Sequence, residues 1–218
     1  MAQRPNEYPH QPLQEPEYHL MIDTAPSAPR VVVFAGPNGA GKSTHADAIL
    51  AGLDIDTFVN ADYIARGLSG RNTDAVAFEA GRIMLRRLQQ LGDTRADFAF
   101  ESTLSSRSFA HFLHGLKAKG YVVAIYYFSL ANAQLAVRRV KLRVALGGHD
   151  VPADVVKRRF GRSLQNFFQL YVPLADEWAL FDNSSAHLAL PVATQFANQL
   201  TITEAATWHK LQKLSQAV

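Results

Sequence analysis

Residues 36–44 carry the sequence GPNGAGKST and fit the pattern G-x-x-x-x-G-K-[ST]. Glycines let the backbone wrap closely around a phosphate, and the N-terminus of a following helix adds its positive end. In this pattern Lys42 bridges the β- and γ-phosphates and Ser43 ligates Mg²⁺. The sequence therefore predicts binding of ATP or GTP with Mg²⁺ and leaves the base open. The predicted nucleotide-binding residues are Gly36, Pro37, Asn38, Gly39, Ala40, Gly41, Lys42, Ser43 and Thr44.

Two carboxylates stand where a phosphoryl-transferring site needs them. Asp62 follows the short apolar segment 57–59, and Glu101 closes the apolar segment 98–100. Because the ends of neighbouring parallel strands share one crevice, we expect both carboxylates to face the phosphate loop. Asp62 is the candidate base for an acceptor hydroxyl, and the alternative is that it caps the next helix. Glu101 would hold Mg²⁺ through water or bind the substrate's hydroxyls; the alternative is a solvated loop carboxylate. The polar side chains expected beside them on the substrate are Asn60, Ser102 and Thr103.

Positive charge is concentrated in residues 138–162, which hold eight Lys/Arg and two Asp, a local net charge of +6 in a chain of +3. Arg139 and Arg143 are spaced i,i+4, and a second pair begins at Arg159 with i,i+3 spacing, so each pair shares a helix face. A Gly-Gly turn separates the pairs. Two arginine-bearing helices joined by a mobile turn predict a lid that closes over the phosphates. A solvated basic face or a nucleic-acid patch is the alternative.

Short apolar runs alternate with helical patterns along the chain, which predicts βαβ units. The fold class is therefore α/β, a nucleotide-kinase-like three-layer P-loop sandwich with a parallel sheet of about five strands. The expected strands are residues 31–35, 57–59, 98–100, 121–128 and 178–181, with a hairpin from residue 188 onward. The expected helices are residues 42–51, 73–91, 108–119, 131–146, one opened by Pro152, and 203–214, with Thr73 and Gly92 as caps of the second.

Composition narrows the class of protein. A chain of 218 residues with 48% hydrophobic residues suits one domain. It has no cysteine, which excludes disulfides, thiolate metal sites and a cysteine nucleophile. No apolar run approaches the roughly 20 residues that cross a bilayer, so we expect no membrane partner and a cytoplasmic protein. Residues 1–29 hold six of the ten prolines and predict a disordered arm, a tail or a partner-binding segment, ahead of a kinase domain over residues 30–218 with its lid at about 138–162.

Taken together, these motifs resemble the zeta-toxin-like family of small P-loop kinases, over about residues 30–185. The phosphate loop alone is unspecific, but the ordered succession of Asn-Ala-Asp, Glu-Ser-Thr and Gly-Gly-His-x-Val-Pro is much more specific. The segments that carry the resemblance are residues 35–44, 60–62, 100–103, 139–152, 159–164 and 182–184.

The resemblance implies a kinase whose better-known members phosphorylate the 3′-hydroxyl of UDP-N-acetylglucosamine. It implies that Asp62 is the base, and that Lys42 and two lid arginines, Arg143 and Arg159 first, stabilise the phosphoryl group, with Arg139 on the nucleotide. It also implies that Glu101, with Ser43, meets the metal or, with Thr103, the acceptor, and that an antitoxin protein can pair with the chain.

Two rival functions stay open on the sequence. One is a kinase for another acceptor, such as a nucleotide, a sugar or an antibiotic. The other is a nucleotide-dependent switch ATPase whose basic stretch grips nucleic acid, a partner that the position of the stretch in a P-loop domain disfavours.

Overall fold

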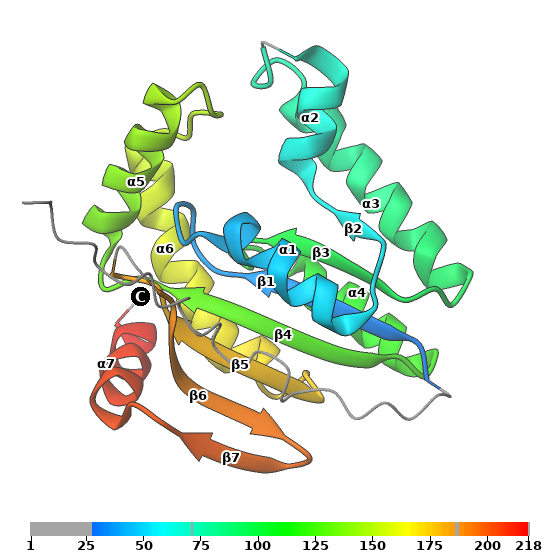
Figure 1. The fold of residues 1–218 in the computed structure, drawn as a ribbon, viewed down its shortest axis with the longest axis vertical. Helices are drawn as coiled ribbons and strands as arrows, with labels where there is room; N and C mark the ends of the chain where they lie inside the picture. The colour runs from blue at the N-terminus through cyan, green and yellow to red at the C-terminus, as the bar shows by residue number, and fades with distance from the viewer. Residues whose placement is uncertain (1–27, 71, 186–187, 218) are drawn as a thin grey trace, which may run out of the picture.

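The fold was analysed in a computed structural model, which describes residues 28–70, 72–185 and 188–217. The predicted arm lies outside the described residues except for Ala28 and Pro29. In the described part of the chain, seven strands form one sheet in the order β2-β3-β1-β4-β5-β6-β7 (Figure 1). The strands are β1 (Arg30–Ala35), β2 (Phe58–Val59), β3 (Phe98–Ser102), β4 (Val122–Ser129), β5 (Glu177–Asp182), β6 (Leu190–Phe196) and β7 (Gln199–Ile202).

Helices cover both faces of this sheet. Figure 1 shows α1 in front of the sheet and α4 and α6 behind it. The helices are α1 (Lys42–Leu53), α2 (Ala61–Ser69), α3 (Ala77–Asp93), α4 (Ser108–Ala118), α5 (Ala133–Ala145), α6 (Ala153–Asn166), the π-helical turn η2 (Phe167–Tyr171) and α7 (Ala205–Gln216). The predicted three-layer α/β class is therefore confirmed.

The central strand β1 explains why the sheet is parallel. All but the first of its residues are fully buried, and it pairs in parallel with β3 on one side and β4 on the other. A strand buried on both faces is a continuous apolar run, as the segment Val-Val-Val-Phe-Ala is. Each of β1, β2 and β3 ends at the same edge of the sheet, so the loops that follow them meet there.

The sequence-based boundaries need three corrections. The predicted helix over residues 73–91 begins at Ala77, because residues 72–76 form turns between two helices, so Thr73 is not its cap. Gly92 is not a C-cap either but lies inside α3, where a Cβ would stand 2.7 Å from Leu116 Cδ2 of α4, so the leucine side chain would have to shift. The short helix α2 entered the sequence analysis only through the alternative that Asp62 caps it, and its extent was not assigned.

The sheet also has more strands than the five or so expected. Five strands are parallel as predicted, and the hairpin predicted after residue 188 adds two antiparallel ones, because β6 pairs with β5 and β7 with β6. Among the described residues, no helix is long and apolar enough to cross a membrane.

Phe167 of η2 packs against β4 and β5, and its substitution tests how much this part of the core contributes to stability. Its buried ring stacks on Tyr127 of β4 at 4.2 Å and meets Trp178 of β5 edge-on at 5.9 Å. We expect Phe167→Ala to lower the free energy of unfolding by about 3–5 kcal/mol, measured by urea denaturation. Phe78→Ala is the control, because that side chain is 81% exposed and its loss should change stability by less than about 0.5 kcal/mol. Equal effects of the two substitutions would contradict this account of the core.

Candidate active site

The loop between β1 and α1 is held open by glycines that have no room for a side chain. Gly36 and Gly41 have φ angles of 136° and 80°. A Cβ on Gly36 would stand 2.2 Å from the Phe128 carbonyl oxygen, and one on Gly41 would stand 2.5 Å from Asn183 Nδ2. Asn183, after β5, also donates to the Ala40 carbonyl at 2.8 Å. The loop is therefore held by Asn183 and by the close approach of β4, and its curved backbone, here called the cradle, suits a phosphate chain.

Lys42 opens α1 and points back into this cradle. Its side chain is 6% exposed, and its ammonium group donates to the Pro37 carbonyl at 3.2 Å and lies 3.4 Å from Glu101 Oε1. A buried cation held at the N-terminus of a helix is placed to meet the β- and γ-phosphates of a nucleotide.

Glu101 is the junction of three loops at the edge of the sheet. Its Oε2 accepts hydrogen bonds from Ser43 Oγ at 2.6 Å and from Asn60 Nδ2 at 2.9 Å. The side chains come from β3, the phosphate loop and the loop after β2. Among the described residues, no group of three His, Asp or Glu side chains could hold a metal by itself. A hydroxyl beside one carboxylate, facing a phosphate cradle, nevertheless fits Mg²⁺, which binds one or two carboxylates together with substrate phosphates.

Asp62 stands across from this junction because of how α2 begins. Asn60 is the N-cap, and its Oδ1 accepts from the backbone N–H groups of Asp62 and Tyr63. Asp62 therefore lies in the first turn and is not itself the cap. Its carboxylate is 46% exposed, and its Oδ2 lies 3.7 Å from Nη1 of Arg143 on α5.

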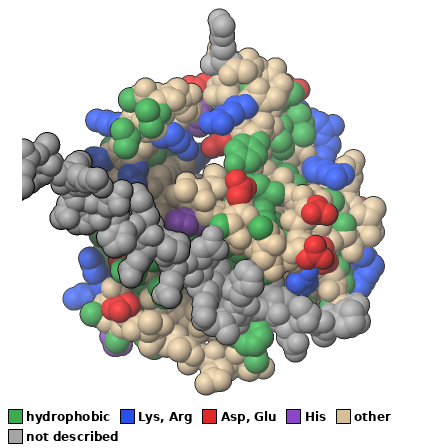
Figure 2. Space-filling view, in the orientation of Figure 1, with side chains coloured by type: hydrophobic (Ala, Val, Ile, Leu, Met, Phe, Trp, Pro, Cys, Tyr) green, Lys and Arg blue, Asp and Glu red, His purple; other side chains and the backbone are tan. Residues whose placement is uncertain are grey.

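These side chains surround one cavity of about 480 Å³. Figure 2 shows a hollow in the upper part of the molecule, where α2 and α3 stand opposite α5 and α6, with Lys and Arg side chains around it. The structure brings together nine of the predicted residues: Gly39, Gly41, Lys42, Ser43, Thr44, Asp62, Glu101, Arg139 and Arg143. Asn60 contacts the cavity wall through Glu101.

Gly36, Pro37, Asn38 and Ala40 of the phosphate loop do not line the cavity themselves, and outside that loop three predicted residues are not brought to it. Ser102 Oγ accepts from the backbone of Leu104, and Thr103 Oγ1 shares a hydrogen bond with Ser105 Oγ at 2.9 Å, so both shape the loop after β3. Arg159 lies half-buried on α6 and is not among the described residues that line the cavity.

Two residues of α2 line the cavity and were missed from the sequence. Arg66 follows Asp62 by four positions and Tyr63 by three, and both are spacings of one helix face. The assignment of α2 as a helix would have revealed them. The pKa of the Tyr63 phenol is raised by partial burial and by the nearby Asp47 and Glu101 carboxylates, with Arg66 opposing the shift. Tyr63 is therefore neutral at physiological pH.

His45 supports the loop from beneath and is a further residue without a sequence-based role. Its ring stacks on Phe128 at 4.9 Å. Burial lowers the pKa of His45, and a hydrogen bond with Asn183 partly opposes that shift. The imidazole under the phosphate loop is thus uncharged at neutral pH.

The basic helices α5 and α6 make up the segment that the sequence predicts to be a lid, and arginines of α5 bind carbonyl groups around it. Arg139 Nη2 donates to the carbonyls of Ser184 and Ser185, at 3.3 and 2.8 Å. Arg143 Nη2 donates to the His149 carbonyl at 2.7 Å, while its Nη1 faces Asp62.

The lid also reaches the opposite arm of the molecule. His149, in the turn between α5 and α6, contacts the Asp74 carboxylate in the connection between α2 and α3. This contact therefore joins two arms of the molecule, the helix pair α2 and α3 and the helix pair α5 and α6, which are labelled in Figure 1. We call this contact the latch. It joins the turn between α5 and α6 to the other helix pair, and the same His149 accepts a hydrogen bond from Arg143 through its carbonyl.

Comparisons with known proteins place the chain among P-loop proteins. The family model described as zeta toxin matches residues 19–185. An uncharacterized protein of Haemophilus influenzae is 29% identical over 135 residues, which cover 60% of this chain and 92% of that protein.

Two solved structures share the fold. The AvrRxo1-ORF1:AvrRxo1-ORF2 complex with sulphate ions gives a TM-score of 0.69 at 17% identity, over 84% of this chain and 63% of that chain. This chain thus spans less than two thirds of that relative. The PezAT toxin-antitoxin system of Streptococcus pneumoniae gives a TM-score of 0.53 at 14% identity, over 88% of this chain and 87% of the matched one. At such identities the likeness shows the fold.

Asp74→Asn tests the latch. Because the contact is largely exposed on the Asp74 side, it is worth at most about 1 kcal/mol. We expect the backbone amides of residues 146–152 to exchange with deuterium about two- to fivefold faster in the variant, measured by hydrogen-exchange mass spectrometry. Asp150→Asn is the control, because it removes a carboxylate of the same turn that pairs with no described cation. Unchanged exchange in Asp74→Asn would show that the contact does not hold the lid.

Proposed function

This chain belongs to the zeta toxin family, and from that premise we propose that it is a kinase that transfers the γ-phosphate of Mg-ATP to a hydroxyl group of a small molecule. The family model covers most of the chain, which confirms the resemblance drawn from the sequence. The observation that carries the proposal is the position of Asp62 across the cavity from Lys42 and Ser43. A hydrolase or a switch does not require a free carboxylate on that side, whereas a kinase needs one to orient the acceptor.

ATP is the proposed donor, and a sugar nucleotide such as UDP-N-acetylglucosamine is the proposed acceptor. The donor is supported by a further structure of the AvrRxo1-ORF1:-ORF2 complex, solved with ATP, which has the same fold with a TM-score of 0.68 at 18% identity. The acceptor is supported by the family likeness. GTP as donor and another small molecule as acceptor are the alternatives. Transfer from labelled ATP to a panel of acceptors identifies the acceptor, and competition by unlabelled GTP identifies the donor.

The proposed transfer is an in-line displacement. Asp62 accepts the proton of the acceptor hydroxyl as its oxygen bonds to the γ-phosphorus, the bond from that phosphorus to the β,γ-bridging oxygen breaks, and ADP leaves with that electron pair. Asp62 then returns the proton to water. Lys42 balances the charge on the phosphoryl oxygens from the loop side.

Two anions can pair with Arg143 in this scheme, the Asp62 carboxylate and the γ-phosphate of the nucleotide. In the structure its Nη1 faces Asp62 at 3.7 Å, but a γ-phosphate in the cradle offers a stronger anion to the same guanidinium. The exchange would release Asp62 when a nucleotide is present. Arg159, which the sequence also predicts to act on the phosphoryl group, stays a prediction, because the lid must move before it can reach the cavity.

Ser43 and Glu101 are the residues that would hold Mg²⁺. When bound, the ion neutralises phosphate charge and fixes the orientation of the β- and γ-phosphates. Glu101 stays in place without it through its hydrogen bonds from Ser43 and Asn60. These hydrogen bonds hold the Ser43 hydroxyl and the Glu101 carboxylate side by side at the edge of the cradle, where the ion would bind.

The partner proposed for the chain is an antitoxin protein. PezAT is described as a toxin-antitoxin system, and the fold of this chain matches it over most of its length. A protein that covers the nucleotide cavity would silence the kinase. Production of the chain alone should therefore arrest growth of a host cell, and Asp62→Asn should remove the arrest.

Asp62→Asn is the direct test of the chemistry. The amide has the shape of the carboxylate but cannot accept the hydroxyl proton, so we expect transfer from γ-labelled ATP to fall by about 10²- to 10⁴-fold. The affinity for ATP should stay within about twofold, because binding depends on the loop. The assay runs against UDP-sugars, other nucleotides, free sugars and water alone.

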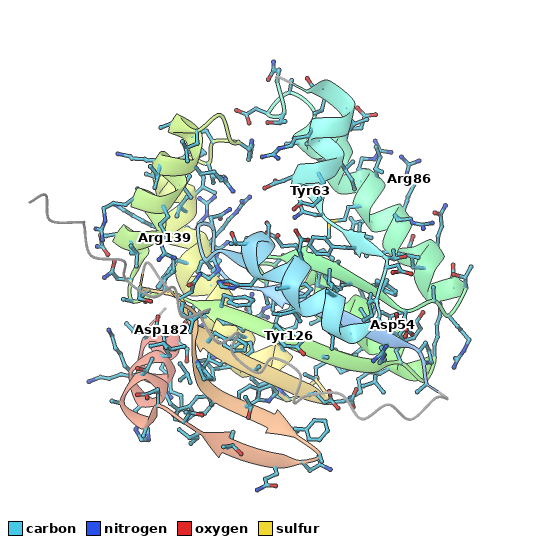
Figure 3. All side chains as sticks on the ribbon, in the orientation of Figure 1. Asp54, Tyr63, Arg86, Tyr126, Arg139 and Asp182 are labelled. Carbon is cyan, nitrogen blue, oxygen red and sulfur yellow. The ribbon has the colours of Figure 1, made fainter. Side chains whose placement is uncertain are left out.

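Asp54→Asn is the matched control. Asp54 follows the last residue of α1 in a left-handed conformation that Asn also adopts, and Figure 3 shows it well apart from Tyr63. It does not line the cavity. It should leave transfer unchanged. Slow release of free phosphate from the wild type, equal in Asp62→Asn, would refute the kinase and favour a switch ATPase.

A further inference from the structure

A second cavity lies against the first and has no role in the chemistry described so far. It has a volume of about 610 Å³ and follows the free edge of β2, the outermost strand on that side of the sheet. Its walls come from β2, α2 and α3. Tyr63 lines both cavities, so the two meet at its ring.

The space in the first cavity is enough for one substrate. Its 480 Å³ lies within the range of about 300–1,000 Å³ that holds a single ligand of drug or nucleotide size. The donor nucleotide must occupy it, since the phosphate cradle and Lys42 form its floor. An acceptor whose hydroxyl reaches Asp62 must therefore extend elsewhere, and the cavity beyond Tyr63 adjoins that point.

Tyr63 forms a fixed wall between the two cavities. Its side chain is 44% exposed, and its ring meets Phe58 edge-on, with centroids 6.0 Å apart and an interplanar angle of 85°. Asp62 and Tyr63 are adjacent on α2. A ring of the acceptor lying on Tyr63 thus stands next to the proposed base.

The far side of the second cavity carries positive charge. Arg86 and Arg87 of α3 line it, and within the described residues neither guanidinium forms an ion pair. Asp56 is the carboxylate that lines the same cavity, which leaves the two arginines in excess. Figure 3 shows Arg86 and Tyr63 on the two helices that flank the edge of β2. Two exposed guanidiniums are suited to phosphate, which they bind through paired hydrogen bonds.

We propose that the cavity along β2 is the distal half of the acceptor site, where the acceptor lies against Tyr63 and places a phosphate or diphosphate group on Arg86 and Arg87. This inference rests on the proposed kinase function and narrows it. It selects acceptors that already carry phosphate, such as sugar nucleotides and nucleotides. It disfavours neutral sugars and cationic antibiotics, which leave the two guanidiniums without a partner.

The test compares binding of a charged and a neutral probe. UDP-N-acetylglucosamine and N-acetylglucosamine are titrated calorimetrically into the protein, with Mg²⁺ and a saturating non-hydrolysable ATP analogue to fill the first cavity. We expect the wild type to bind the charged probe at least tenfold more tightly. The double variant Arg86→Gln/Arg87→Gln should lose about 10- to 100-fold in affinity for the charged probe, as expected for charge-assisted hydrogen bonds. Its affinity for the neutral probe should not change.

Arg82→Gln is the matched control, because Arg82 is an exposed arginine of the same helix that does not line the cavity. It should behave as the wild type. The retained affinity of the double variant for the ATP analogue reports that the fold and the first cavity are intact.

The outcomes separate this inference from the proposed function. A double variant that keeps the full preference for the charged probe overturns the inference, and so does a wild type that binds the neutral probe equally well or the charged probe not at all. Failure of the kinase itself is a different result, namely no transfer to any acceptor in the labelled-ATP assay.

Discussion

The site depends on one buried carboxylate, Glu101. Three loops that follow three adjacent strands would otherwise end independently at the edge of the sheet. Glu101 is only 15% exposed, and it is neutralised by Lys42 and accepts hydrogen bonds from Ser43 and Asn60. A buried charge that loses a partner costs several kcal/mol, so the loops can settle only where all of these contacts form at once. This requirement fixes the cradle relative to the start of α2, and hence relative to Asp62.

The second constraint is the division of the molecule into two arms above this fixed floor. One arm, α2 with α3, carries the proposed base and the proposed acceptor groove. The other, α5 with α6, carries the cations of the lid. The arms meet through exposed contacts, Arg143 with Asp62 and His149 with Asp74, which are individually weak. A rigid floor with weakly joined arms is suited to a reaction that must open for substrates and close against water.

The phosphate loop and Glu101, which form the floor of the cavity, could largely be predicted from the sequence. The helices α2 and α5, which form its walls, could be predicted less well. The phosphate loop is a local pattern, and the apolar run before it predicted β1, so Lys42 and Ser43 were placed with their roles. Glu101 was found because it closes an apolar strand. The extent of α2 was not assigned and its cap was placed at Asp62 in the alternative, because Asn60 and Asp62 are both good caps and only the fold shows that Asn60 is the cap. For the same reason Tyr63 and Arg66 were not predicted as residues of the site.

The lid shows the same limit. Helical spacing predicts which arginines share a face but not which face turns inward, since that depends on how α5 packs against the loop after β5. Arg139 and Arg143 line the cavity, whereas Arg159 does not. Ser102 and Thr103 were predicted to meet the substrate because they follow Glu101. In the structure, hydrogen bonds to their nearest neighbours hold them in the loop.

The most direct test of the central claim is a crystal structure of the protein with Mg²⁺ and a non-hydrolysable ATP analogue. The account predicts the γ-phosphate within hydrogen-bonding distance of Lys42, the metal beside Ser43 and Glu101, and the Arg143 guanidinium on the phosphate with Asp62 left free to face an acceptor. A nucleotide bound elsewhere, or a γ-phosphate that leaves Asp62 paired with Arg143, would contradict it.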